Sequence, residues 1–164
     1  MSFRVEENGQ FRGRVSFLDA DLNAGCVEAK HVKVGAGLEA SKLEHQHRAV
    51  YAQESATACA DEARVAHVVK GTAGTLKTFK AGCVVACVGD STITVDLTKD
   101  GVSVLTAAIS LSVAQAAYQL VEGVIDSAAV AAGDVLEVVI DGTVGTGTLG
   151  LGVFAFVDLH EAVD

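Results

Sequence analysis

Three glycines near the end of the chain carry the spacing of a nucleotide-binding motif. Gly145, Gly147 and Gly150 spell G-x-G-x-x-G within the run DGTVGTGTLGLGVFAFVDL. In a dinucleotide-binding fold this loop follows a strand, opens a helix and belongs to a unit of about 30 residues. Only 14 residues follow Gly150, and they are β-branched and aromatic rather than helix-forming. We therefore expect the glycines to shape a loop between two antiparallel strands, and we expect no nucleotide cofactor.

A second candidate chemistry is metal binding. His45 and His47 form a His-x-His pair, and His31 or Cys26 could complete a zinc site with them. No second pair stands at ligand spacing, and both histidines lie in a polar segment rich in Glu and Lys. We expect these histidines to be exposed or to lie at an interface, and we expect no metal.

Catalytic patterns are also missing from the sequence. It contains no G-x-S-x-G nucleophile elbow and no D-x-D-x-D-G calcium loop. Aspartate is common at strand edges and turns, and that is where the sequence places Asp96, Asp100, Asp134 and Asp141. We expect no enzyme and no cofactor, although a pair of carboxylates acting as in glycosidases stays open.

The cysteines indicate a reducing compartment. Cys83 and Cys87 lie in CVVACV, an expected strand in which four residues span roughly 13 Å, too far for a disulfide. Cys26 and Cys59 stand alone, so we expect buried free thiols. The first 17 residues are too polar for a signal peptide, and no apolar run reaches the ~18 residues of a membrane span. We expect a protein that is made and kept in the cytoplasm.

Charge is distributed unevenly along the chain. Residues 1–80 hold 11 Lys and Arg against 10 Asp and Glu, whereas residues 81–164 hold one Lys against 11 acidic residues. Nucleic-acid binding needs a basic footprint, and an anionic membrane surface would also repel the acidic half. We therefore predict no direct contact with nucleic acid and no membrane association.

The composition and hydrophobic pattern of residues 63–164 are typical of an all-β domain. Valine and alanine dominate, the chain has 17 glycines and no proline, and short apolar runs alternate with Gly, Asp and Thr. The pattern predicts strands at 64–70, 75–79, 83–88, 92–98, 102–105, 116–125, 134–141 and 152–159. Lys99-Asp100-Gly101 joins two of them in the clearest hairpin. Seven or eight antiparallel strands in about 100 residues predict a β-sandwich, in particular a jelly roll.

Residues 1–62 are polar and mixed in charge, and they resemble an extended arm rather than a domain. Asn8-Gly9 predicts a short hairpin, and the capping-box spacing of Ser41 and Glu44 predicts a short helix over 41–49. A helix of that length is too short to be stable alone. We expect this arm to drape over a partner.

Several strands carry apolar residues on both faces. In GVFAFVDL, Phe154 and Phe156 point to one side, and Val153, Ala155 and Val157 point to the other. An antiparallel sheet in an isolated sandwich normally has one solvated face. The second face therefore needs a cover, which could be the N-terminal arm or another subunit. We expect a homo-oligomer, with a homotrimer fitting a small β domain that has a long arm.

The segments GAGLEASKLEHQHRAVYAQ, TITVDLTKDGVSVLTAAISLSVA and AAGDVLEVVIDGTVGTGTLGLGVFAFVDL, within residues 30–164, resemble the capsid decoration (cement) proteins of tailed bacteriophages. The resemblance implies a trimeric β-sandwich or jelly roll on the outside of the head, where it joins neighbouring subunits of the major capsid protein. It also implies a virion protein that is assembled in the host cytoplasm.

Within this interpretation the arm supplies the contacts with the partner, and its basic residues would dock on an acidic shell. The expected contact residues are Arg4, Arg12, Arg14, Lys30, Lys33, Leu38, Leu43, His45, His47 and Tyr51. The alternative is a receptor- or carbohydrate-binding β-sandwich of a phage fibre or tail. With two tyrosines and no tryptophan, the chain has few aromatic rings for stacking on sugars. An enzyme on a jelly-roll scaffold is a third interpretation.

Overall fold

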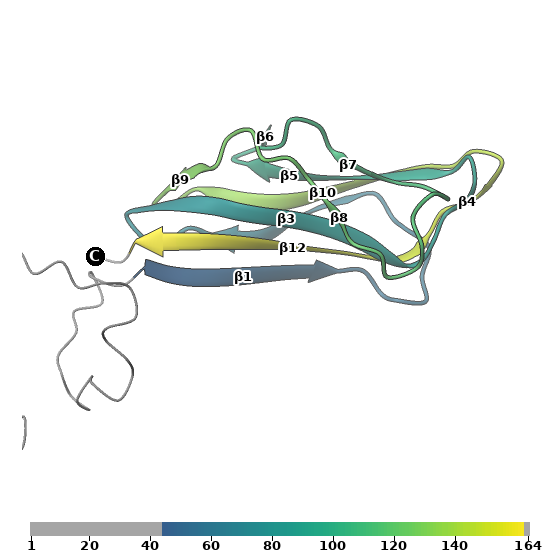
Figure 1. Ribbon diagram of the computed structural model, residues 1–164, viewed down its shortest axis with the longest axis horizontal. Coiled ribbons are helices and arrows are strands. Elements are labelled where there is room, and N and C mark those ends of the chain that lie inside the picture. The colour runs from purple at the N-terminus through teal and green to yellow at the C-terminus, as the bar shows by residue number, and fades with distance from the viewer. Residues whose placement is uncertain (1–43, 163–164) are drawn as a thin grey trace, which may run out of the picture. The chain divides into compact units, whose positions relative to one another are not determined.

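The computed structural model describes residues 44–162, and for Glu44 and His45 it describes the backbone alone. All regular elements in this range are β-strands (Figure 1). In chain order they are β1 (Glu44–Ala52), β2 (Glu62–Val68), β3 (Ala73–Val85), β4 (Val88–Gly89), β5 (Thr92–Lys99), β6 (Val102–Ser103), β7 (Ile109–Leu111), β8 (Val121–Glu122), β9 (Ala129–Ala131), β10 (Val135–Thr143), β11 (Gly147–Thr148) and β12 (Leu151–Ala162).

The described strands form two antiparallel sheets of five strands and one short ribbon. Sheet A has the order β1-β12-β3-β8, and β9 also pairs with β3. Sheet B has the order β2-β10-β5-β6, and β7 also pairs with β5. The ribbon consists of β4 and β11. Figure 1 shows β1, β12 and β3 side by side as the long strands of sheet A.

This arrangement is a jelly-roll sandwich. Apart from the short β4, β6, β9 and β11, the chain places β1, β12, β3 and β8 in one sheet and β2, β10, β5 and β7 in the other. Most connections therefore cross between sheets, and the first described strand lies beside the last, as in a double Greek key. The all-β sandwich predicted from the sequence is confirmed.

The two sheets bury their facing sides in one core. In β5, Ile93, Val95 and Leu97 are fully buried while the residues between them are less so, which is the alternation expected of a strand with one buried face. Sheet A contributes large side chains such as Phe79 and Leu159. Valine, isoleucine and leucine fill most of the remaining core, and the β-branched valines and isoleucines serve both strand propensity and packing.

The predicted hairpin after β5 is present. Thr98 pairs with Ser103 and Lys99 with Val102 across a two-residue turn. Asp100 and Gly101 both have positive φ, 51° and 82°, as a type I′ turn requires. An Asp-Gly sequence suits that turn because both residues tolerate the left-handed region.

The helix predicted over 41–49 is wrong for its described part, because residues 44–52 form strand β1. Every residue of β1 is in register with β12, from Glu44 opposite Ala162 to Ala52 opposite Phe154. The capping-box spacing carries a weak local preference, and pairing along nine residues overrides it. The sandwich therefore begins at residue 44 rather than at 63, and the rest of the expected arm, with the Asn8-Gly9 hairpin, lies outside the described residues.

Other strand predictions differ mainly in length. The strands expected at 75–79 and 83–88 form one long strand, β3, which ends at Val85. Within the expected strand 116–125, only Val121 and Glu122 pair with β3, and the residues before them form turns. Alanine-rich sequence does not distinguish a paired strand from a covering loop, which explains this error.

Candidate interaction surface

The structure describes only part of the expected partner-contact set. Leu38, Leu43 and the basic residues at 4, 12, 14, 30 and 33 lie outside residues 44–162, and His45 is described only as part of β1. His47 and Tyr51 are opposite the buried Leu159 and Ala155, so both side chains lie on the inner side of sheet A. These two residues help to close the sandwich instead of forming its outer surface.

His47 belongs to a polar cluster that joins the two sheets. Its ring lies 5.5 Å, centroid to centroid, from the ring of His67 in β2. His67 in turn hydrogen-bonds through Nε2 to the carboxylate of Glu161, which is only 2 % exposed. The backbone N–H groups of Lys70 and Gly71 donate to the same carboxylate at 3.1 and 2.8 Å.

Burial by itself would raise the pKa of Glu161. The hydrogen bond from His67 and those from the backbone of Gly71 and Lys70 outweigh burial, and the pKa of Glu161 is lowered. The carboxylate therefore stays ionised and ties β12 of sheet A to β2 and to the connection that follows it.

Tyr51 belongs to a second polar cluster, which lines a hollow of about 330 Å³. The Tyr51 hydroxyl and the Gln53 side chain both donate to Oε1 of Glu62, and Arg64 Nε donates to Oε2 at 2.8 Å. Burial, with the neighbouring carboxylate, raises the pKa of Tyr51 to about 12. The hydrogen bond from Tyr51 is the main cause of the lowered pKa of Glu62. The cluster fastens the 53–61 connection to the edge strands of both sheets.

The outer face of sheet A carries apolar side chains where solvent would favour polar ones. Val50 lies directly opposite Phe156, and Ala52 lies opposite Phe154. The Phe154 ring covers Gly82 of β3, because its Cζ is 2.9 Å from where a Cβ would stand. The Gln119 carbonyl lies 2.6 Å from the same point, which brings the 118–120 segment against this edge of the phenylalanine.

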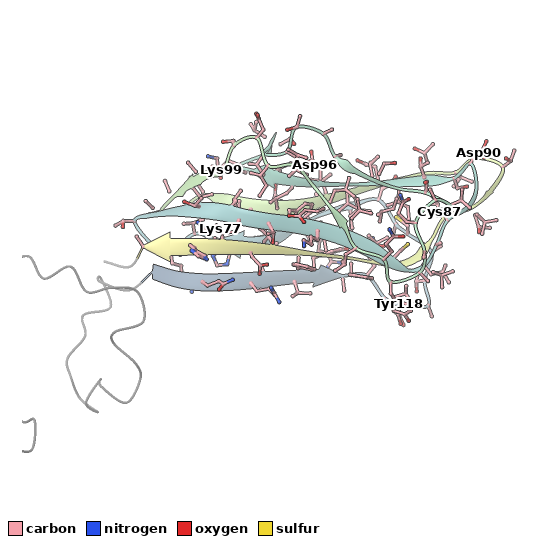
Figure 2. All side chains as sticks on the ribbon, in the orientation of Figure 1. Lys77, Cys87, Asp90, Asp96, Lys99 and Tyr118 are labelled. Carbon is pink, nitrogen blue, oxygen red and sulfur yellow. The ribbon has the colours of Figure 1, made fainter. Side chains whose placement is uncertain are left out.

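We call this surface the outer apolar patch. Val50 is 68 % exposed, Tyr118 67 % and Leu120 43 %, while the two phenylalanines are half-buried. Figure 2 shows Tyr118 on the outside of the sandwich, at the end that also holds Cys87 and Asp90. The patch consists of Val50, Ala52, Tyr118, Leu120, Phe154 and Phe156.

The charges beside the patch are paired with one another. Arg48 donates from Nε and Nη2 to the two carboxylate oxygens of Asp158 at 2.6 and 3.0 Å. Its guanidinium also lies 5.2 Å from the ring centroid of Phe156, within range of a cation–π contact. The hydrogen bond from Arg48 is the main reason for the lowered pKa of Asp158, and Thr78 adds a further hydrogen bond. On the neighbouring strands, Lys80 Nζ lies 3.1 Å from Glu122.

The outer face of sheet B has a different composition. Its central strands β10 and β5 place Glu137, Asp141 and Asp96 on that side, and the described register places no Lys or Arg among them. Threonines from β5 fill the spaces between these acidic side chains. Valines share this face, among them Val139 opposite Asp96 and the exposed Val65 opposite Glu137. This face therefore combines acidic and aliphatic side chains, whereas the face of sheet A carries phenylalanine rings and ion pairs.

The G-x-G-x-x-G glycines form the connection from β10 in sheet B to β12 in sheet A, two strands that are not paired with each other. A Cβ at Gly145 would stand 2.1 Å from Oδ1 of Asp90, and one at Gly147 would stand 2.0 Å from the Val88 carbonyl. Close approach of the Asp90 side chain and the Val88 backbone, which leaves no room for a Cβ, therefore explains these two glycines of the motif. Strand β12 follows Gly150 in place of the helix of a dinucleotide fold.

The same end of the sandwich contains the described cysteines. Cys59, Cys83 and Cys87 are free and buried, as expected, and Cys87 lies beyond the end of β3 rather than within it. The pKa of Cys59 is raised to about 11, mainly because the thiol is buried. Burial also raises the pKa of Cys83. Both thiols therefore stay protonated near neutral pH and react slowly. Cys26 lies outside the described residues.

An apolar hollow of about 470 Å³ adjoins these residues. Its lining includes Val85, Val88 and Val144, all of which are exposed. Within residues 44–162, no three His, Cys, Asp or Glu side chains are placed so as to hold a metal ion. The same range contains no helix long and apolar enough to cross a membrane.

Comparison with models of known protein families found no match, and a search of curated proteins found none either. The class of the described domain therefore follows from its own geometry: an all-β jelly-roll sandwich with an apolar outer face on one sheet.

The sequence indicated part of this surface but missed its extent. The alternation in GVFAFVDL shows that Phe154 and Phe156 share a face. It does not show that Val50 lies opposite Phe156, because that neighbour is more than 100 residues away in the chain. Nor does it place Tyr118 and Leu120 beside Gly82, since the intervening turns have no periodic pattern.

Proposed function

We propose that this chain is a structural virion protein, a decoration protein that binds the outside of a tailed-phage head as a homotrimer and stabilises contacts between major capsid subunits. It acts by binding and has no enzymatic activity. A protein that binds only the assembled lattice stabilises it by mass action. Several copies joined together multiply weak individual contacts. The protein would then reside on the capsid surface after assembly in the host cytoplasm.

The observation that carries the proposal is the outer apolar patch with its paired charges. Large exposed apolar surfaces on small domains mark sites of protein–protein contact. An apolar centre surrounded by satisfied polar groups is the usual anatomy of such interfaces. The jelly-roll sandwich and the resemblance to decoration proteins agree with a binding role, and the basic residues before Glu44 would supply the contact with the shell.

The test uses empty heads of the tailed phage whose genome encodes this sequence. The full chain should co-sediment with expanded heads and raise their disruption temperature. A variant that lacks residues 1–43 keeps β1 and the whole described sandwich, so it should fold but bind the heads at least about tenfold more weakly. Failure of the full chain to bind would refute the proposal. Equal binding by both forms would refute the role of the N-terminal residues.

The hollow at Tyr51 supports one alternative, a carbohydrate-binding module of a fibre or tail. It combines an aromatic ring with the carboxylate of Glu62, the amide of Gln53 and the guanidinium of Arg64, groups that can hydrogen-bond sugar hydroxyls. Binding to a glycan array that Glu62→Gln abolishes, without binding to heads, would favour this alternative.

A further inference from the structure

We infer that the outer apolar patch of sheet A is the surface through which this chain contacts another copy of itself. The inference rests on the part of the proposed function in which copies associate, and it does not require a capsid as partner. It identifies the contact surface, which the proposed function leaves open.

The first support is the size and chemistry of the patch. Val50 and Tyr118 are mostly exposed and Leu120 is partly exposed, and they flank two phenylalanines that also retain some exposure to solvent. Tyrosine and phenylalanine bury large areas and dominate interface energies. Exposure of these apolar side chains to water is unfavourable, so covering them with another protein surface would contribute hydrophobic stabilisation.

The second support is the backbone at Tyr118. Its φ of 61° lies in the left-handed region, which is unfavourable for a bulky residue. Among the described residues other than glycine, it shares a positive φ only with Asp100 in the hairpin turn. Hydrogen bonds hold the segment in place, among them those from Tyr118 N to the Cys83 carbonyl and from Gln119 N to the Ala116 carbonyl. Strain of this kind persists where the surroundings enforce it, and it is concentrated at functional positions. Here it presents an aromatic ring to the outside.

Charge decides which partner fits the patch. The chain has a net charge of −9, so two copies repel each other over most of their surfaces. Like charges brought together across an interface cost several kcal/mol. Beside the patch, Arg48 is paired with Asp158 and Lys80 with Glu122, so these charges would not repel a second copy.

The opposite face would not allow the same contact. Sheet B presents Asp96, Glu137 and Asp141 without a neighbouring cation on its central strands. A basic partner would select that acidic face, whereas another acidic copy would avoid it. The face of sheet A, with its phenylalanine rings and ion pairs, is therefore suited to self-association.

Two matched variants test the inference. Val50 and Val65 both lie on edge strands, with exposed fractions of 68 % and 56 %, but Val50 faces outward from sheet A and Val65 from sheet B. Sedimentation equilibrium of the full chain should give a mass of at least two protomers at tens of micromolar, a range in which roughly micromolar association is measurable. Val50→Asp should raise the dissociation constant at least about 100-fold, because it buries an unpaired charge. Val65→Asp should leave the dissociation constant nearly unchanged.

A second measurement reports directly on Tyr118. The chain has two tyrosines and no tryptophan, so Tyr51→Phe leaves Tyr118 as the one intrinsic fluorophore. Acrylamide should quench its fluorescence less as protein concentration rises through the association range. Unchanged quenching in an associated protein would show that Tyr118 stays exposed and would overturn the inference.

The remaining outcomes are equally decisive. A monomeric wild type at tens of micromolar, or equal weakening by both aspartate variants, would overturn the inference. A monomer that binds phage heads and loses this binding in Val50→Asp would assign the patch to the capsid instead. That result would overturn self-association through the patch and preserve the decoration role, so the two failures are distinguishable.

Discussion

The two sheets of the sandwich have equivalent inner faces and contrasting outer faces. Inside, Val157 of sheet A and Val138 of sheet B are equally inaccessible to solvent. Outside, sheet A presents aromatic rings and ion pairs, while sheet B presents carboxylates among threonines and valines. Packing of the core constrains only the side chains on the inner faces. The difference between the outer faces can therefore be related to what each of them contacts.

The contrast extends to individual carboxylates. Asp158 on sheet A is nearly buried and receives hydrogen bonds from Arg48 and Thr78. Asp141 on sheet B is exposed, with no cation beside it on the described strands of that face. A carboxylate can therefore be part of a structural network on one face and a solvated charge on the other, although the residue type is the same.

The largest expected effect tests whether both sheets unfold as one unit. Glu161→Gln should lower the free energy of unfolding by about 3 kcal/mol near pH 7, because it breaks a buried network that joins sheet A to His67 of sheet B. Urea unfolding followed by circular dichroism measures the change. Glu137→Gln on the outer face of sheet B is the matched control, with an expected change within about 0.5 kcal/mol.

The same variant has a defined pH signature. The pKa of Glu161 is lowered in the folded state, so its contribution to stability is present above the ordinary value of 4.5 and is lost as pH falls through the folded pKa. The difference in stability between wild type and Glu161→Gln should therefore shrink when urea unfolding is repeated below about pH 4. A difference that stays constant would contradict the role assigned to the ionised carboxylate.

An intermediate effect separates the two outer faces. Asp158→Asn should lower the free energy of unfolding by about 1–2 kcal/mol, because it weakens hydrogen bonds to a charged acceptor that is largely removed from solvent. Asp141→Asn should change it by less than about 0.5 kcal/mol. Thermal unfolding of the two variants under identical conditions provides the measurement. Equal losses would show that the faces are less different than their contacts indicate.

The smallest expected effect concerns charge alone. Lys80→Glu should destabilise the protein by roughly 0.5 kcal/mol, because it replaces an ion pair with Glu122 by a repulsion. Glu137→Lys should stabilise it by a similar amount, because it removes an acidic group and places a cation diagonal to Asp96 on the neighbouring strand. Both changes should fade as salt is added. Shifts of the same sign in both variants would contradict the contrast between the faces.

Local patterns predicted much of the sandwich. The alternation in TITVDLT located β5, and Asp100-Gly101 located the turn that follows it. The close approach of Asp90 and Val88 shows why the glycines of GTGTLG are needed in a connection. The strand and the turn depend on residues that are close in the sequence, where propensity and turn geometry act, whereas the partners of the glycines lie more than 50 residues away.

Contacts between distant segments were not predictable in the same way. The segment around His45 and His47 reads as a short helix, yet residues 44–52 all pair with β12. The clusters around Glu161 and Glu62 were not anticipated, because each unites side chains from different strands or connections. His47 and Tyr51 were selected as contact residues for their type, and only the register showed that they face inward.

The sequence by itself determined that this protein is a β-sandwich with an acidic second half and with strands that are apolar on both sides, because alternation and composition act residue by residue. The tertiary structure decided which apolar residues meet on one outer face, which charges neutralise each other beside them, and which carboxylates become buried. These outcomes depend on strand order and register, and pairing across more than 100 residues is set by the packing of the whole sandwich rather than by any local stretch of chain.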